Sequence, residues 1–109
     1  MKKLNYFIQC RVYDLEETKT IKKNVHGYVV DKETAIHYDN ECGLYKFTDL
    51  KTGLLIKYFC CKTYKKAIEL FNNDEQLKYK LTRHRQKDYY LKQIEDFNGL
   101  EVINNAILE

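Results

Sequence analysis

The spacing of apolar residues changes at Thr63, and this change limits the folds that the chain can adopt. Before Thr63, apolar residues alternate with polar ones in short runs that turn-forming residues separate. After it, they recur every three or four residues. A period of two is typical of half-buried strands, and a period of about 3.6 is typical of amphipathic helices. The order therefore predicts a sheet followed by helices.

The length of 109 residues fits one domain with a single core. We predict an α+β fold in which an antiparallel sheet of four or five strands, over residues 5–60, precedes two or three C-terminal helices over residues 63–108. Short connections favour antiparallel neighbours, because a parallel pair needs a long crossover. The helices are expected to pack on one face of the sheet.

Five segments carry the strand pattern. The expected strands are residues 5–13, 25–30, 34–38, 44–48 and 54–60, with a charged loop over 14–24. Gly27 is expected at a bulge or at a close approach between backbones. Gly53 is expected to take the positive φ that closes the last hairpin. The fifth segment is apolar on both faces, which is typical of a strand that is central or covered by a helix.

The first helix is expected to begin after Thr63, whose hydroxyl can accept a hydrogen bond from an otherwise unpaired helical N–H group. Its apolar stripe continues as far as Phe71. Two asparagines then break the pattern. The second of them, Asn73, lies three residues before Gln76, a spacing that resembles a capping box for the next helix.

The apolar face of the second helical segment changes near residues 86–89, which predicts a kink or a break there. Asn98-Gly99 is expected to end that segment, because glycine is favoured just after a helix. A last short helix is expected from Leu100 onward. The predicted core consists of Ile8, Val12, Val29, Ile36, Phe47, Ile56, Ile68, Phe71, Leu77 and Leu81.

The chain lacks the residue patterns of several enzyme classes. It contains no serine, so a serine nucleophile is absent. Its four glycines form no phosphate-binding loop. The cysteines and histidines do not have the spacing of a zinc site. We therefore expect no cofactor and no metal, and nothing in the sequence gives a positive reason to propose an enzyme.

The four cysteines are interpreted as reduced, half-buried thiols. The sequence alone does not decide whether Cys10 and Cys60 form a disulfide. Cys42 lies in an expected turn and is the best candidate for a nucleophile, with His26 or His37 as its base. The simpler interpretation is a turn cysteine near two unrelated strand histidines. A small enzyme is thus the third class of function that we consider.

The best functional signal is a basic segment over residues 76–87, which has five basic residues and no acid. Residues 88–109 contain five acids and one lysine, so the charge is polarised. Three of the cations form one row on a helix, and tyrosines beside them can stack on bases or pack in protein interfaces. These cations suit a solvated helix face, an acidic protein surface or phosphates. The candidate binding residues are Lys78, Tyr79, Lys80, Arg83, Arg85, Lys87, Tyr89 and Tyr90.

The C-terminal segment has a second apolar face, which predicts either a homodimer or a cover formed by the last short helix. The residues expected at the dimer contact are Leu91, Ile94, Phe97 and Ile103. No apolar stretch approaches the ~20 residues that span a membrane. The first residues also lack the pattern of a signal peptide, so we expect a cytoplasmic protein with no membrane partner.

Residues 45–56, followed by 63–67, resemble a sheet-to-helix arrangement in small uncharacterised proteins of bacterial phages and mobile elements. In those proteins a Thr-Gly hairpin closes a sheet, and a Thr-x-Lys-x-Ala helix follows. The resemblance implies a bacterial host in which tiny proteins block defence systems by binding, anti-CRISPR proteins among them. The expected function is thus a non-enzymatic protein-binding module that inhibits a nuclease complex of CRISPR-Cas type. The alternative is nucleic-acid binding through residues 76–87.

Overall fold

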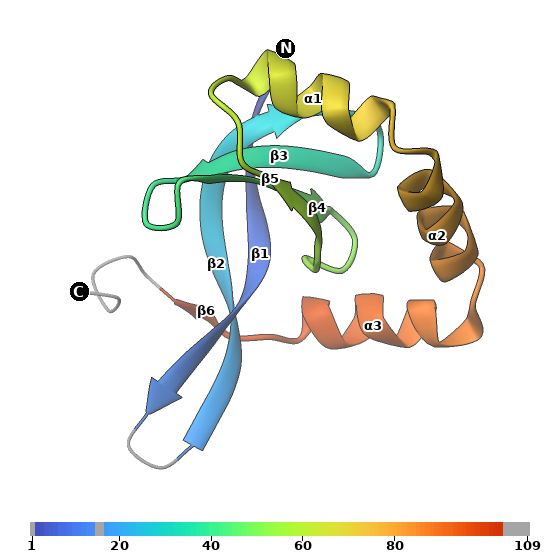
Figure 1. Ribbon diagram of the computed structural model, residues 1–109. Coiled ribbons are helices and arrows are strands. Elements are labelled where there is room, and N and C mark those ends of the chain that lie inside the picture. Colours follow the sequence, from blue (N-terminus) through green and yellow to red (C-terminus); the bar gives the residue numbers. More distant parts are fainter. Residues whose placement is uncertain (1, 15–16, 104–109) are drawn as a thin grey trace.

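The computed structural model describes residues 2–14 and 17–103, which form a curled antiparallel sheet and three helices (Figure 1). Five strands are hydrogen-bonded in sequence order, and the helices follow them. This arrangement confirms the expected α+β fold. The elements are β1 (Lys3–Asp14), β2 (Glu17–Val29), β3 (Thr34–Asp39), β4 (Leu44–Asp49), β5 (Leu55–Phe59), α1 (Tyr64–Asn72), α2 (Glu75–Arg85) and α3 (Asp88–Asn98).

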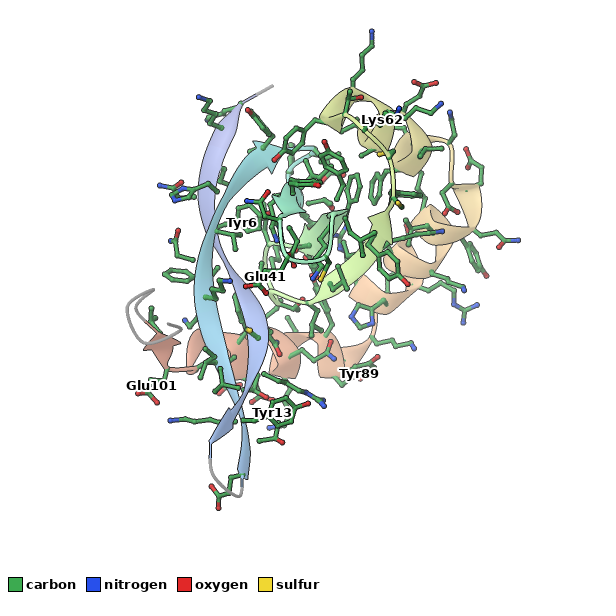
Figure 2. All side chains as sticks on the ribbon, turned by 60° about the vertical axis from the view of Figure 1, so that its left-hand side comes forward. Tyr6, Tyr13, Glu41, Lys62, Tyr89 and Glu101 are labelled. Carbon is green, nitrogen blue, oxygen red and sulfur yellow. The ribbon has the colours of Figure 1, made fainter. Side chains whose placement is uncertain are left out.

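Strands β1 and β2 form a long hairpin, from the pair Lys3–Tyr28 to the pair Asp14–Glu17. The predicted loop over residues 14–24 is therefore wrong, because most of it belongs to β2. The charged residues of this segment did not prevent a strand, since pairing with β1 satisfies the backbone and leaves many of the side chains in solvent. Tyr13, near the free end of the hairpin, is 86% exposed (Figure 2).

The main core lies between the sheet and α1. The rings of Phe47 and Phe71 stack with their centroids 4.3 Å apart. Thr63 caps α1, as expected, by accepting a 3.1 Å hydrogen bond from the Lys66 N–H group. Three predicted core residues are buried in this cluster, and four more pack against it. The buried three are Ile36, Phe47 and Phe71, and the other four are Ile56, Ile68, Leu77 and Leu81.

The prediction is wrong for Ile8, Val12 and Val29, which are only half-buried. Side chains alternate between the two faces of a strand, and Tyr28 is paired with Ile36 on the face that α1 covers. The strand register therefore turns these three residues to the opposite face.

That opposite face is enclosed in part because the sheet curls. The Gln9 N–H group on β1 donates a 2.8 Å hydrogen bond to the Gly53 carbonyl group, between β4 and β5. Inside the curl, the Tyr6 hydroxyl and His37 Nδ1 are 3.1 Å apart, and both side chains are buried. Gly27 lies at a close backbone approach, as expected, because a Cβ atom there would overlap the Ile36 carbonyl oxygen.

The chain after α3 differs from the prediction. Helix α3 ends at Asn98 as expected, but Val102–Ile103 forms a short strand, β6, instead of a last helix. It pairs in parallel with Lys22–Lys23 of β2. Strand β3 pairs with β2 only at Tyr28 and Val29, so backbone groups at Lys22 are left for β6. The rest of the predicted helix, over 104–108, lies outside the described residues.

The structure corrects the predicted cap of α2 and the predicted cover of β5, and it confirms the break after α2. Asp74, rather than Asn73, caps α2 through a 3.0 Å hydrogen bond from the Leu77 N–H group. The predicted break near 86–89 is confirmed, since α2 and α3 are separate helices. Strand β5 is the last strand of the sheet, and Leu55 and Tyr58 on it are exposed. Ile56 and Phe59 of the same strand pack against the core, so β5 is covered only in part.

Candidate binding surface on the second and third helices

The structure separates the eight predicted binding residues into two groups. Six side chains are exposed on α2, α3 and the turn between them. Arg85 and Tyr90 turn inward, and Tyr90 is only 4% exposed. We call the exposed group the basic corner; it consists of Lys78, Tyr79, Lys80, Arg83, Lys87 and Tyr89.

Cations lie against both exposed tyrosines of the basic corner. Arg83 donates a 3.0 Å hydrogen bond to the Tyr79 hydroxyl, and its guanidinium carbon is 5.8 Å from the centre of that ring. The Lys87 ammonium is 5.6 Å from the centre of the Tyr89 ring. Such contacts are favourable because the face of an aromatic ring is electron-rich. Each tyrosine thus presents an apolar edge beside a positive charge.

The cations of the basic corner form no ion pair within the described part of the chain. Among the described residues, no carboxylate lies within 4.0 Å of its lysine or arginine nitrogens. By contrast, Lys92 on α3 pairs with Asp96 at 3.7 Å. The basic corner therefore offers four positive charges without ion-pair partners to an anionic partner.

The inward side chains of Arg85 and Tyr90 meet at the carboxylate of Asp49, at the end of β4. The Tyr90 hydroxyl donates a 2.6 Å hydrogen bond to Asp49 Oδ2. The Arg85 guanidinium lies 3.5 Å from Asp49 Oδ1 and 3.1 Å from Glu33 Oε2. Burial and the Asp49 carboxylate together raise the pKa of the Tyr90 hydroxyl. These contacts hold α2 and α3 against the turn between β4 and β5, so we call Asp49, Arg85 and Tyr90 the polar anchor.

The anchor was missed at the level of sequence, where residues 49–53 indicated only a hairpin. The Asp49 carboxylate also accepts hydrogen bonds from the Lys51 N–H group, at 3.3 Å, and from the Thr52 hydroxyl, at 3.1 Å. Those two contacts are local turn chemistry that the residue types can indicate. The helical partners lie more than thirty residues away, and no local pattern identifies them.

The apolar face that was expected to form a homodimer is partly used within the chain. Phe97 is buried and packs on Gly53, where a Cβ atom would overlap its ring. Leu91 remains 71% exposed, and Ile94 is half-buried. The side chain of Ile103 lies outside the described part of the chain. Phe97 is therefore not available to a second copy.

A groove of 620 Å³ is lined by Cys42, the candidate nucleophile, and by its two candidate bases, His26 and His37. Burial lowers the pKa of His37 to about 4, and its Nδ1 atom contacts the Tyr6 hydroxyl. The Nδ1 atom of His26 is hydrogen-bonded to the Asn5 side chain. The Nδ1 atom of each histidine is therefore hydrogen-bonded to another side chain and not to the Cys42 thiol. All four cysteines are free.

Searches against family models, curated proteins and solved structures found no match to this chain. Within residues 2–14 and 17–103, no three His, Cys, Asp or Glu side chains are grouped to hold a metal ion. No helix in this part of the chain is both long and apolar enough to cross a membrane. The chemistry of the surface is therefore the basis for inferring a function.

Proposed function

We propose that the chain is a non-enzymatic protein-binding module whose basic corner docks on an acidic surface of a partner protein. The supporting observation is the group of four cations without ion-pair partners around exposed Tyr79 and Tyr89. Tyrosine and arginine are enriched where protein interfaces carry most of their binding energy. The polar anchor fixes both helices, which reduces the ordering cost of binding.

Nucleic-acid binding by α2 is the second candidate, because Lys80 and Arg83 lie three residues apart on the helix and Lys87 follows in the turn before α3. Two features make it the weaker one. Arg85 points away from solvent, so the row on the other flank keeps only Lys78. Arg83 and Lys87 also occupy ring faces of the tyrosines on which bases would stack.

The class of partner follows from the resemblance of residues 45–56 and 63–67 to small phage and mobile-element proteins. We infer that the partner is a bacterial defence nuclease complex of CRISPR-Cas type. The chain would inhibit it by occupying an acidic surface that the nuclease needs. An acidic surface suits the basic corner because complementary charges speed encounter and suppress wrong partners.

The test is capture of partners from lysates of cells that carry such a complex, with and without nuclease treatment. The variant Arg83→Glu with Lys87→Glu should abolish capture of the complex. The matched control is Lys62→Glu with Lys65→Glu, which makes the same charge change on exposed residues. Figure 2 shows Lys62 beside α1, far from Tyr89 on α3. Capture that survives nuclease and is lost only in the first variant supports the proposal.

Binding kinetics with the purified complex then separate the two candidates. For a protein partner, the double variant should slow association more than it speeds release. For duplex DNA, four phosphate contacts would give a slope of about −3.6 in log affinity against log salt. If the nuclease activity of the complex is unchanged at a saturating concentration of this protein, the proposed inhibition is wrong. Capture that is equal in both double variants would contradict docking through the basic corner.

A further inference from the structure

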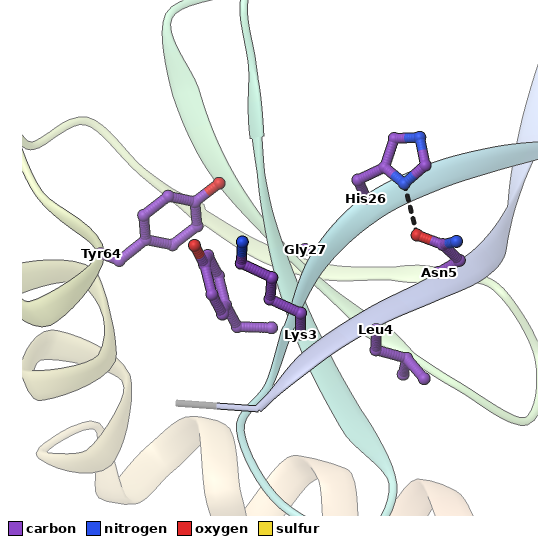
Figure 3. A pocket seen from close by; sticks show the side chains of 7 residues that line it. Lys3, Leu4, Asn5, His26, Gly27 and Tyr64 are labelled. Carbon is purple, nitrogen blue, oxygen red and sulfur yellow. Dashed lines mark hydrogen bonds between the residues drawn. The ribbon is translucent and has the colours of Figure 1, made fainter.

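The pairing of β1 with β2 gathers six side chains on one face of the hairpin. Side chains alternate along each strand, so every second pair of the ladder projects to the same side. Figure 3 shows Lys3, Asn5 and His26 on one side of the ribbon and Leu4 on the other. We call the group the outer ribbon face; its three pairs are Lys3–Tyr28, Asn5–His26 and Phe7–Asn24.

The outer ribbon face combines positive, amide and aromatic groups without a carboxylate. Lys3, Asn5, Asn24 and His26 are exposed, whereas the two aromatic rings are half-buried. Residues 2–13 and 18–30 contain no acid at all. The Lys22 ammonium, on the next pair along this face, lies 5.6 Å from the Phe7 ring centre and donates a 3.1 Å hydrogen bond to the Asn98 carbonyl group. Phe7 and Lys22 are therefore already engaged within the chain, and the free groups lie nearer to Lys3. This surface therefore favours a ligand that is both anionic and aromatic.

A cleft opens at one end of this face, where Tyr64 of α1 stands over the hairpin (Figure 3). Its volume is 390 Å³, within the range of roughly 300–1,000 Å³ that is usual for ligand sites. The Tyr64 and Tyr28 rings are held edge to face, with centroids 4.8 Å apart. The Tyr64 hydroxyl is fixed as well, since it accepts a hydrogen bond from the Tyr38 N–H group. The backbone of Gly27 also lines the cleft.

We propose that the outer ribbon face binds single-stranded nucleic acid. A base enters the cleft against Tyr64 and Tyr28, and the Lys3 ammonium neutralises a neighbouring phosphate. The Asn5 amide N–H group donates a hydrogen bond at a base edge, since its Oδ1 atom already contacts His26 Nδ1, and Asn24 donates and accepts there. Aromatic and basic groups on an exposed sheet are the chemistry by which proteins hold unpaired bases. Paired bases are stacked inside a duplex, so they cannot reach the cleft.

This site goes beyond the proposed protein partner and uses different residues from the basic corner. The test measures anisotropy of a short labelled single-stranded oligonucleotide at low salt, with a duplex and polyglutamate as competitors. Lys3→Gln should lower the slope of log affinity against log salt by about 0.7, the value for one phosphate on a single strand. Tyr64→Ala should weaken binding ~5- to 150-fold through lost stacking. Circular dichroism checks that this variant folds.

Asn5→Ala with Asn24→Ala changes only exposed groups, so it tests the site even if Tyr64→Ala does not fold. This double variant should weaken oligonucleotide binding. The control Lys32→Gln, at an exposed lysine between β2 and β3, should not. Arg83→Gln with Lys87→Gln should leave oligonucleotide affinity unchanged. Absence of binding at low salt would overturn the proposal, as would equal competition by polyglutamate or by duplex. Loss of binding only in the basic-corner variant would also overturn it and would favour α2 as the nucleic-acid site.

Discussion

Tyr90 on α3 donates a 2.6 Å hydrogen bond to the carboxylate of Asp49, which lies 41 residues earlier at the end of β4. Both residues are buried, at 4% and 2% exposure. The same carboxylate contacts the Arg85 guanidinium of α2. One acidic side chain therefore fixes both helices that carry the basic corner. The geometry of the proposed binding surface depends on a residue that does not belong to it.

Tyr90→Phe should lower the free energy of unfolding by about 1–3 kcal/mol, because the buried Asp49 carboxylate loses a hydrogen-bond donor. Urea denaturation followed by circular dichroism measures the change. Tyr89→Phe is the matched control. Its ring is 47% exposed, so the expected change is within about 0.5 kcal/mol. Equal losses in the two variants would contradict the anchoring role of Tyr90.

Arg85→Met should destabilise the fold by about 2 kcal/mol, because Asp49 stays buried with less compensation for its charge. Removing one partner of a fully buried ion pair costs about 3–5 kcal/mol. The expected loss is smaller here because the Arg85 side chain is 19% exposed. Arg83→Met, two residues earlier, should leave stability unchanged but weaken partner binding. Thermal unfolding and binding kinetics on both variants test this separation. An Arg85→Met protein as stable as Arg83→Met would contradict it.

The sequence predicts the parts of the fold that local patterns determine. The strands at residues 34–38 and 44–48 and the cap at Thr63 have strong alternation or strong turn chemistry, and the structure confirms them. The first half of β2 was missed because it is polar, and its pairing with β1 is not visible along the chain. Strand β6 has only two residues, too few to show a period.

The same limit applies to the binding surface. Arg83 and Arg85 are alike in type and lie on one helix, so local sequence does not distinguish an exposed residue from an anchoring one. What distinguishes them is the position of Asp49, which depends on how the sheet and helices pack. The outer ribbon face was missed for a related reason. Its residues come from two segments that alternate with core residues, and only the register brings them together.

Gly53→Ala should destabilise the chain by more than Gly43→Ala. Both glycines have a left-handed backbone, with φ of +67° and +68°. A side chain in that conformation costs about 1–2 kcal/mol by itself. At Gly53 a Cβ atom would also overlap the Phe97 ring, whereas at Gly43 the nearest atom is 3.7 Å away. Chemical denaturation of both variants isolates the cost of displacing Phe97, and equal costs would show that α3 yields freely.

Stability should fall as the pH drops from about 6.5 to about 4, because His37 is buried as a neutral ring. Burial lowers its folded-state pKa to about 4. The negative charge of Asp39 raises the pKa of His37, whereas the positive charges of Lys46 and Lys23 lower it further. An unfolded histidine titrates near its ordinary pKa of about 6.5. Between these two values the unfolded chain binds more protons, so the free energy of unfolding decreases with falling pH. The shift corresponds to about 3 kcal/mol in total.

Unfolding free energies of the native chain and of His37→Gln, measured across this pH range, test the assignment. The variant should start with a lower stability, because it loses the contact with Tyr6, but its stability should change little down to pH about 4.5. His26→Gln removes an exposed ring, so it should keep the slope of the native chain. Below pH about 4 a second decrease is expected in all three proteins. The hydrogen bond to Lys46 holds the pKa of the Asp39 carboxyl group at about 2 in the folded chain. As the pH falls, Asp39 is therefore protonated in the unfolded chain before it is protonated in the folded chain, and stability decreases. A slope that persists in His37→Gln would assign the pH dependence to other groups.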